Sequence, residues 1–466
     1  MDRSAFPTVD HAWLVEEYQA AVDVAGDESV EVVHGRHVLP SRLAATDLAV
    51  GAVATAAGAA LRLLRARAGR DGAATVDGRR VSASFRSDRH FRLDGTAVEA
   101  FAPLSGFWRA HDGWVRTHAN YPHHRLRLLR ALGLSEETTP AQVASVLAER
   151  DALEVEQALV DTGAVGVAVR SPVEWAAHEQ ASALAELPLV GSTRLDDAPS
   201  RPITVLPTHA SQPAVGLRVL DFTRVIAGPV ASRTLALLGA DVLRVDSPRL
   251  PEIPWQHLDS GMGKRSTLLD LRTEQATLEE LLDDAHVLIL GYRPDALTRF
   301  GLAPEDVAAR HPGLVVATLS AWGSVGPWAQ RRGFDSIVQA ATGIAVIEGD
   351  ESTPGALPAQ ALDHATGYLL TAAILDAVVR QRSNSGSIHV QAHLARTAVA
   401  LLKHRDPTPR RLPEVSDLLR KRATSAGALT YAPPALHLAG TPDDWNTVGG
   451  QWGVDPPRWA PDASNA

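Results

Sequence analysis

Leu217-Arg-Val-Leu-Asp-Phe222 opens the stretch that decides the fold, because it is a short apolar run typical of a buried strand. A turn with Gly228-Pro229 follows, then a helical segment over 230–238 that Gly239 closes. The next apolar run is Asp241-Val-Leu-Arg-Val245. A strand, a helix and a second strand in this order predict parallel pairing, because parallel strands need a long crossover connection.

The same alternation continues along the chain. Helices are expected over 274–284 and 304–310, and strands over 286–290 and 314–318. Repeated strand and helix units predict an α/β fold, with a Rossmann-like, doubly wound large domain over residues 214–424.

The chain before this domain has a different pattern. Residues 100–200 alternate short strand and helix patterns and are expected to form a smaller α+β domain, followed by a linker over 201–213 that is rich in Pro, Ser and Thr. Residues 1–99 contain an Ala-rich helix candidate over 45–67 and an alternating stretch over 73–85 that predicts a strand.

Composition narrows the class of protein. The formal net charge of −9 argues against a general nucleic-acid binder. The absence of Cys excludes disulfides, cysteine nucleophiles and metal sites built from cysteine thiolates. The most apolar stretch, 48–64, is too short and too rich in Ala and Gly for a membrane span and predicts a buried helix. Residues 1–20 carry acids and no apolar core, so no signal peptide is expected. We expect a cytoplasmic protein with no membrane partner and with a Pro- and Trp-rich tail over 425–466.

One segment of the sequence occurs twice. The 11 residues from Asp47 to Ala57 align without gaps to Asp363–Ala373, and six positions are identical. Two Ala-rich helices can match through composition alone. The alternative is that a unit of one helix and one strand occurs twice in the chain.

Four standard catalytic and nucleotide-binding motifs are absent from the sequence. The chain has no Walker A motif, no dinucleotide fingerprint, no His-Glu-x-x-His zinc motif and no Gly-x-Ser-x-Gly elbow. The adjacent His123 and His124 are expected to point to different faces of a helix and to lie on the surface, so no metal is expected. Asp363 remains, at the start of a predicted helix. It is either a helix N-cap or an ionised nucleophile beside free backbone N–H groups that could stabilise an oxyanion.

An ordered series of motifs over residues 214–403 resembles the large domain of the class III CoA-transferases, the group of formyl-CoA transferase and carnitine CoA-transferase. The series comprises Gly216–Pro229, Leu238–Val245, Gly263–Ser266, Leu269–Leu271, Tyr292–Pro294, Arg299–Leu302, Ser320–Pro327, Arg332–Ala340, Leu362-Asp363 and Gly367. The resemblance implies that Asp363 is the nucleophile and that the enzyme moves CoA from an acyl-CoA to a carboxylic acid through an aspartyl-CoA thioester.

The resemblance also implies partners and contacts. Coenzyme A is expected as a substrate and product, a carboxylate as the acceptor, and an interlocked homodimer as the assembly. The implied CoA contacts are Val225, Ile226, Ala227, Tyr292, Arg299, Phe300, Arg332 and Phe334. Lys264 and Arg265 are either further contacts or residues of a solvated surface.

A related branch of the family, the α-methylacyl-CoA racemases, uses a His base in a Gly-His-Asp motif. Here the motif reads Gly333-Phe334-Asp335, and Phe cannot accept a proton, so a transferase is favoured. A racemase- or isomerase-like enzyme and a non-catalytic CoA-binding homologue stay open as alternatives.

The order of the domains departs from the family. Residues 100–200 resemble the small domain that usually follows the nucleophile, and residues 45–85 resemble the nucleophile segment, with Asp47 in the nucleophile's place. A trimmed tandem ancestor or a permutation would explain this order. Gly291 stands where Asn is usual and Ser247–Pro251 replace a Gly-Gly-Asp run, which keeps the non-catalytic alternative open.

Overall fold

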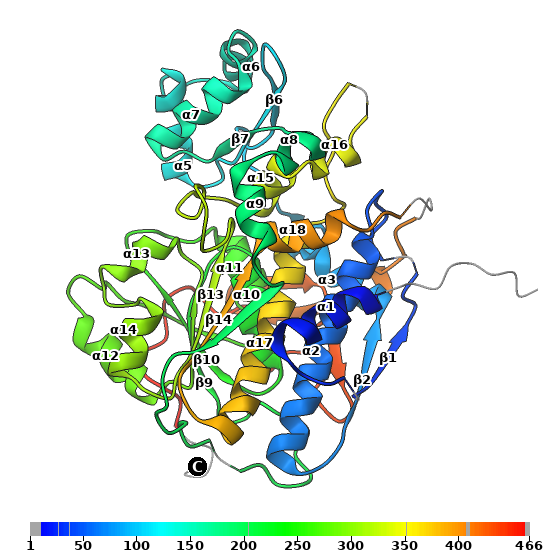
Figure 1. Ribbon diagram of the computed structural model, residues 1–466, viewed down its shortest axis with the longest axis vertical. Coiled ribbons are helices and arrows are strands. Elements are labelled where there is room, and N and C mark those ends of the chain that lie inside the picture. Colours follow the sequence, from blue (N-terminus) through cyan, green and yellow to red (C-terminus); the bar gives the residue numbers. More distant parts are fainter. Residues whose placement is uncertain are drawn as a thin grey trace, which may run out of the picture.

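A seven-stranded sheet forms the centre of the protein in the computed structural model, which describes residues 11–26, 28–36, 38–203, 205–350, 352–406 and 411–461 (Figure 1). Across the sheet the strands are β11 (Arg265–Leu268), β10 (Asp241–Asp246), β9 (Arg218–Phe222), β12 (Val287–Leu290), β13 (Val315–Ser320), β14 (Ile388–His393) and β8 (Val190–Arg194). The first six are parallel, and β8 pairs antiparallel with β14 at the edge. The predicted α/β fold with a large parallel sheet is therefore confirmed.

Helices cover both faces of this sheet because the strands are apolar on both sides. Leu220 and Leu288 point into a core shared with one set of helices, whereas Val219 and Ile289 point into the core on the opposite face. The first set comprises α12 (Gln275–Asp284), α13 (Pro294–Thr298) and α14 (Pro304–Arg310). The second comprises α10 (Ala227–Leu237), which connects β9 to β10, and the long α17 (Ala361–Asn384).

Residues 107–168 form a separate lobe with its own apolar core, at the top of Figure 1. It contains β5 (Phe107–Arg109), β6 (Trp114–Thr117), β7 (Gly166–Ala168), α5 (Pro122–Leu132), α6 (Pro140–Ala148) and α7 (Ala152–Thr162). The chain returns to the large sheet through α8 (Pro172–Ala176) and α9 (Glu179–Ala185). No strand is predicted over 188–213, but β8 lies there; its sequence, Val-Gly-Ser-Thr-Arg, contains a single aliphatic residue and so lacks a strand pattern.

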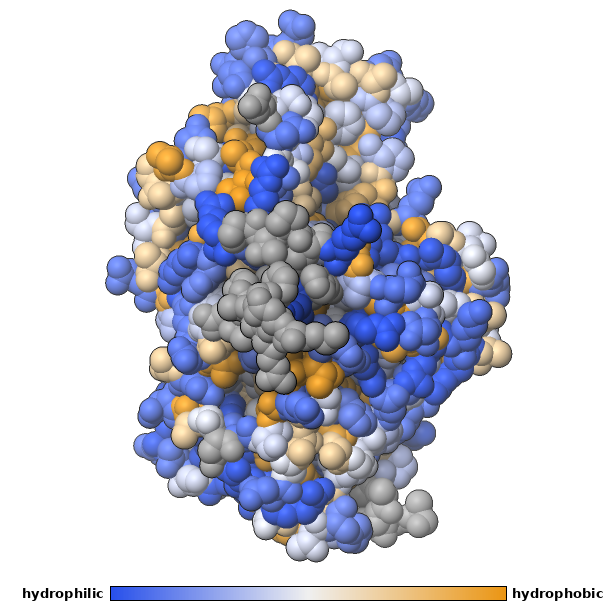
Figure 2. Space-filling model, turned by 90° about the vertical axis from the view of Figure 1, so that its right-hand side faces the viewer, coloured by the Kyte–Doolittle hydropathy of each residue, from blue (hydrophilic) through white to orange (hydrophobic). Residues whose placement is uncertain are grey.

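The N-terminal region packs beside α17. It contains α1 (Ala12–Val22), β1 (Ser29–Val33), α2 (Ala45–Ala68), β2 (Ala73–Asp77), α3 (Gly78–Phe85), α4 (Ser87–His90), β3 (Arg92–Leu93) and β4 (Thr96–Ala97). Of residues 1–20, for which no signal peptide is expected, residues 1–10 lie outside the described part. Figure 2 views the molecule from this side and shows hydrophilic residues over most of the visible surface.

The predicted strand over 73–85 is wrong beyond Asp77. The Asp77 side chain accepts a hydrogen bond from the Arg79 N–H at 2.9 Å and so caps α3, which begins at Gly78. A Cβ on Gly78 would lie 2.2 Å from the backbone oxygen of His34, so only glycine allows the chain to turn here. Neither constraint shows in the alternating pattern.

The internal repeat is a structural repeat. In each copy a 24-residue helix leads into a strand and then a second helix, α2–β2–α3 in one copy and α17–β14–α18 (Leu394–Leu402) in the other. Thr55 and Thr371, which the alignment makes equivalent, donate the same hydrogen bond to a glycine carbonyl one turn earlier, at 2.8 and 2.9 Å. The alternative in which a helix–strand unit occurs twice is confirmed.

The two long helices, α2 and α17, lie side by side. Both are long and apolar enough to cross a membrane by composition, but 89% and 94% of their most apolar windows are buried inside the protein. The expectation of a buried core helix over 48–64 is met. Arg62 of α2 joins the helices through two hydrogen bonds to Asp376 of α17, both 2.8 Å.

The C-terminal region returns to the N-terminal one. β15 (Arg420–Thr424) and β16 (Gly427–Tyr431) extend a small sheet with β3 and β4, and β17 (Leu436–Leu438) pairs with β2. Residues 439–461 carry no helix or strand. Three indole N–H groups fix this segment to the large domain: Trp445 donates to Arg233 O, Trp452 to Asp246 Oδ2 and Trp459 to Leu281 O, at 2.9, 2.9 and 3.1 Å. The remaining elements are α11 (Pro254–Ser260), α15 (Asp335–Ala341), α16 (Ile344–Glu348) and a short 3₁₀ helix over Ser416–Leu418.

Candidate functional site

A cleft of about 1460 Å³, including space open to solvent, lies where the carboxyl ends of several parallel strands meet the smaller lobe. The turns after β9, β12 and β13 form its floor, and α5 of the lobe forms the opposite wall. Ligand sites in parallel α/β sheets lie at this edge, because the connecting loops diverge there.

The cleft brings together eight of the nine residues predicted from the sequence. Its lining includes Val225, Ile226, Ala227, Tyr292, Arg299, Arg332, Phe334 and Asp363. The ninth, Phe300, lines an adjoining cavity of about 870 Å³ that shares Tyr292 and Arg299 with the cleft. Lys264 and Arg265 line neither: Lys264 is buried against Asp221 at 3.0 Å, and Arg265 binds Asp241 at 2.8 Å.

Asp363 lies in the first turn of α17, with 6% of its surface exposed. The N-cap position belongs to Gln360, so Asp363 is not the N-cap residue. Its backbone N–H is not free either, because it donates to Oδ2 of Asp335 at 3.0 Å. Burial raises the pKa of Asp363 well above its usual range, and the neighbouring Asp335 carboxyl raises it further.

The turn between β9 and α10 is strained. Val225 has a φ of 71°, a left-handed conformation that a β-branched residue rarely adopts. The turn is held against α17 at close range, because a Cβ on Gly367 would lie 2.4 Å from the carbonyl oxygen of Ala227. The position of Asp363 relative to this turn is therefore fixed by packing.

Arginine side chains give the cleft its charge. Arg127 of α5 donates to the carbonyl of Gly163, and a Cβ on Gly163 would lie 2.8 Å from an Arg332 nitrogen. Arg293 is near enough that, after burial, it and Arg127 lower the pKa of Arg332, to about 10. Within the described part of the chain, none of Arg127, Arg293, Arg299 and Arg332 forms an ion pair with a carboxylate. This cluster suits an anionic ligand.

His123 and His124 are not surface residues. Both line the cleft, and His124 is buried. The surface expectation is wrong because Pro122 is the first residue of α5, so both imidazoles stand at the helix end that faces the large domain. Burial, followed by His123 and His118, lowers the pKa of His124 to about 2, so its ring is neutral. His118 stacks on Phe334, with ring centroids 3.9 Å apart.

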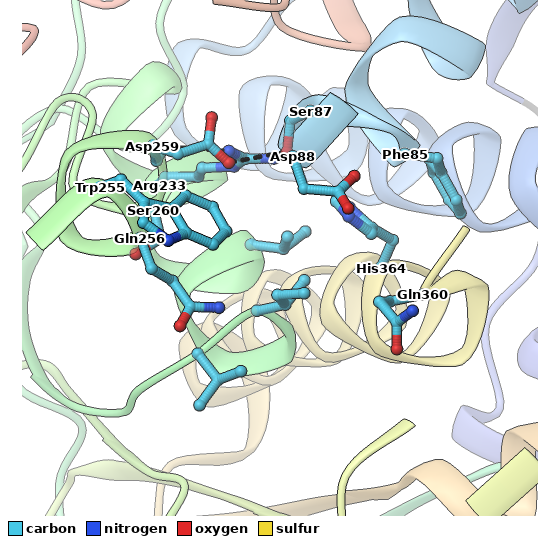
Figure 3. A pocket seen from close by; sticks show the side chains of 13 residues that line it. Phe85, Ser87, Asp88, Arg233, Trp255, Gln256, Asp259, Ser260, Gln360 and His364 are labelled. Atoms are coloured by element: carbon cyan, nitrogen blue, oxygen red, sulfur yellow. Dashed lines mark hydrogen bonds between the residues drawn. The ribbon is translucent and has the colours of Figure 1, made fainter. Parts of the chain in front are cut away.

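A second, smaller chamber of about 370 Å³ lies behind the cleft and shares Val225 and Ile226 with it (Figure 3). Its polar lining includes residues from three parts of the chain: Ser87 and Asp88 of α4, Arg233 of α10 with Asp259 of α11, and His364 of α17. Ser87 donates to Asp259 at 2.7 Å. The sequence carries no motif for this chamber, because the N-terminal region closes it only after folding.

No group of three or more His, Asp or Glu residues in the described ranges has the arrangement of a metal site.

Comparisons with known proteins find matches to part of this chain. Residues 215–413 match the sequence model of CoA-transferase family III. A probable fatty acyl-CoA transferase of Mycobacterium tuberculosis is 35% identical over 213 residues, which cover 42% of this chain and 54% of that protein. An acetyl-coenzyme A transferase of Hypoxylon pulicicidum is 30% identical over 63% of this chain and 53% of its own. This chain spans about half the length of the curated relatives it matches.

Among solved structures, a hypothetical protein from Mycobacterium tuberculosis is 36% identical over 42% of this chain and 58% of its own, with a TM-score of 0.39. A CaiB/BaiF family protein from Brucella suis is 26% identical over 47% of this chain and 65% of its own, with a TM-score of 0.38. The sequence match to CoA-transferase family III therefore covers residues 215–413, somewhat less than half of the chain.

Proposed function

We propose that this chain transfers CoA from an acyl-CoA to a carboxylic acid, with Asp363 as the nucleophile. One observation carries the proposal: the same cleft is lined by the buried carboxyl of Asp363 and by arginines that form no ion pair with a carboxylate among the described residues. These arginines extend outward to Arg299, which is exposed. An acyl-CoA has a thioester at one end, which would meet Asp363, and phosphates at the other, which would meet the arginines. The match to CoA-transferase family III and the names of the relatives support the same chemistry.

The proposed reaction proceeds in four steps. A carboxylate oxygen of Asp363 attacks the thioester carbonyl, the carbon–sulfur bond breaks, and a mixed anhydride and CoA thiolate form. The thiolate attacks the aspartyl carbonyl, which releases the first acid and leaves an aspartyl-CoA thioester. The acceptor carboxylate attacks this thioester to form a second anhydride and thiolate. The thiolate attacks the acceptor's carbonyl, and Asp363 is regenerated as a carboxylate.

The smaller lobe of the same chain completes the proposed site, since α5 provides His123, His124 and Arg127 to the cleft. This arrangement supports closure in cis despite the changed order of domains. The Rossmann-like character of residues 214–424, the interlocked homodimer and the cytoplasmic location stay predictions from the sequence.

Intact-protein mass spectrometry tests the proposal directly. The protein is mixed with acetyl-, succinyl- or long-chain acyl-CoA without an acceptor acid, and each sample is divided and treated with or without hydroxylamine. The expected result is a CoA- or acyl-sized adduct that hydroxylamine removes, because it attacks activated aspartyl carbonyls. Saturable CoA binding without an adduct or any transfer would instead favour a non-catalytic CoA-binding protein.

Arg332→Gln is expected to weaken CoA binding by about tenfold, because it removes one charge-assisted contact to a phosphate. Titration calorimetry at two salt concentrations measures the loss and should show a smaller salt dependence in the variant. The matched control is Arg331→Gln, since Arg331 is paired with Glu156 at 2.8 Å and does not line the cleft. Equal losses in both variants would argue against phosphate binding at Arg332.

A racemase-like activity is the second candidate, and one observation favours it. Phe334 replaces the family's His base, but the neutral ring of His124 lies against Phe334 and lines the same cleft, with ring centroids 5.8 Å apart. Deuterium incorporation at the acyl α-carbon without an acceptor acid, lost in His124→Gln, would support it. Transfer without such incorporation would exclude it.

A further inference from the structure

Asp335 is a buried carboxyl that accepts hydrogen bonds from the first turn of α17 and from Gln339. It is the first residue of α15 and has no exposed surface. Its Oδ2 accepts the backbone N–H of Asp363 at 3.0 Å, and its Oδ1 accepts the side-chain amide of Gln339. Gln339 is itself fixed, since its Oε1 accepts the backbone N–H of Leu357 at 2.8 Å.

Two carboxyl groups therefore meet in a buried site with little opposite charge. The nearest cation is Arg116 of β6, which lies between the rings of Phe101 and Phe107, 5.0 and 4.8 Å from their centroids, and forms no ion pair with Asp335. The other charged or titratable groups near this end of α15 are neutral or turned elsewhere. His118 after β6 stacks on Phe334, Glu348 of α16 accepts the backbone N–H of Arg42, and Arg396 of α18 binds Glu17. His364 of α17 lines the second chamber, the other titratable groups of α17 lie further along the helix, and β7 carries none.

We propose that Asp335 is a positioning residue for Asp363: its carboxylate fixes the first turn of α17, and its negative charge determines the pH at which Asp363 becomes ionised. This inference rests on the proposed function, in which Asp363 is the nucleophile. Asp335 does not line the cleft, so it acts through Asp363 and not on the substrate.

The sign of the pH effect follows from the arrangement. Burial raises the pKa of Asp335 to about 6, and burial together with the charge of Asp335 raises the pKa of Asp363. Protonated Asp363 cannot attack a thioester, so adduct formation falls as the pH drops below the raised pKa of Asp363. Without the charge of Asp335, Asp363 ionises at a lower pH, and the acidic limb of the profile moves to lower pH.

Asp335→Asn alone also loses a hydrogen bond. Both partners of Asp335, the Gln339 amide and the Asp363 N–H, are donors, and the amide nitrogen introduced at position 335 would face one of them. The double variant Asp335→Asn with Gln339→Glu exchanges the amide and the carboxylate. The carboxylate introduced at position 339 can then accept from both the new amide at position 335 and the Leu357 N–H. The amide oxygen at position 335 still accepts the N–H of Asp363. The exchange keeps the hydrogen bonds and moves the negative charge one side chain further from Asp363.

The measurement is the rate of adduct formation against pH in the wild-type protein and in both variants. The acidic midpoint is expected to fall by about one pH unit or more in Asp335→Asn and by less in the exchange variant, which should retain most of the rate at high pH. An unchanged midpoint with a rate reduced equally at every pH would overturn the proposal and leave Asp335 a structural cap. If Asp363 is not the nucleophile, the wild-type protein forms no adduct or forms one that Asp363→Ala retains, which separates the two failures.

A readout independent of activity is the pH dependence of the free energy of unfolding. A carboxyl whose pKa is higher in the folded than in the unfolded state stabilises the fold at low pH, and this stability is lost as the pH rises from about 4 through the folded pKa. Removing Asp335 should reduce this loss between about pH 4 and 6. An unchanged slope would contradict the proposal.

Discussion

Asp363→Ala is expected to reduce CoA transfer by at least about 1000-fold, because Asp363 is the only carboxyl group among the described residues that line the cleft. The variant should still bind CoA, since the arginines of the cleft do not contact Asp363 through any ion pair. Steady-state assays measure the turnover, and intact mass spectrometry measures the hydroxylamine-sensitive adduct. Both should disappear together in this variant.

The internal repeat provides the matched control. Asp47 is the equivalent residue of α2 and does not line the cleft, so Asp47→Ala should transfer CoA at near the wild-type rate. Asp363→Asn separates lost chemistry from lost folding. The raised pKa of Asp363 means that its ionised form destabilises the fold above the unfolded pKa, so the Asn variant should be as stable as the wild type or more stable at neutral pH. Substantial turnover in Asp363→Ala would refute the covalent mechanism.

Asp376→Ala is expected to destabilise the protein by about 3–5 kcal/mol, the largest stability effect that we anticipate for a single substitution. The Asp376 side chain is 1% exposed; it accepts two hydrogen bonds from Arg62 and one, at 2.7 Å, from the hydroxyl of Tyr18. Its loss leaves a 12% exposed guanidinium group with Glu28 alone and a buried hydroxyl without its acceptor. Chemical denaturation at neutral pH measures the change.

A variant that removes the whole charge cluster distinguishes the ion pairs from packing. Arg62→Met with Asp376→Leu and Glu28→Gln removes all three charges and fills the space around Asp376 with apolar atoms, so it should recover most of the stability that Asp376→Ala loses. If the triple variant is as unstable as Asp376→Ala, the loss comes from packing of α1 against the long helices and not from an unpaired charge.

The pattern of apolar residues along the chain was sufficient to predict the strands of the central sheet. Runs such as Val287–Leu290 are apolar at every position because helices cover both faces of the sheet, and such runs are visible without any knowledge of partners. The floor of the cleft was predictable for a related reason. Val225 and Tyr292 follow directly after β9 and β12, which places both at one edge of a parallel sheet, whereas Asp363 begins a helix far from any strand and its role was predicted through the family resemblance.

Features set by distant contacts were not predictable. The end of β2 depends on the carbonyl of His34 beside Gly78, and the strand character of β8 depends on β14. The burial of His124 depends on how the smaller lobe docks on the large domain. Asp335 was seen only as part of a motif, because its partner N–H belongs to Asp363, in another helix.

The pairing of β8 with β14 and of β2 with β17 sets the order in which the protein can fold during synthesis. β8 emerges from the ribosome long before β14, and β2 long before β17, so neither sheet can close until most of the chain has been made. During that interval the apolar α2 lacks α17, the neighbour that later buries it. Such non-local pairing slows folding and leaves apolar surface exposed, so we expect chaperones to bind α2 until α17 has been made.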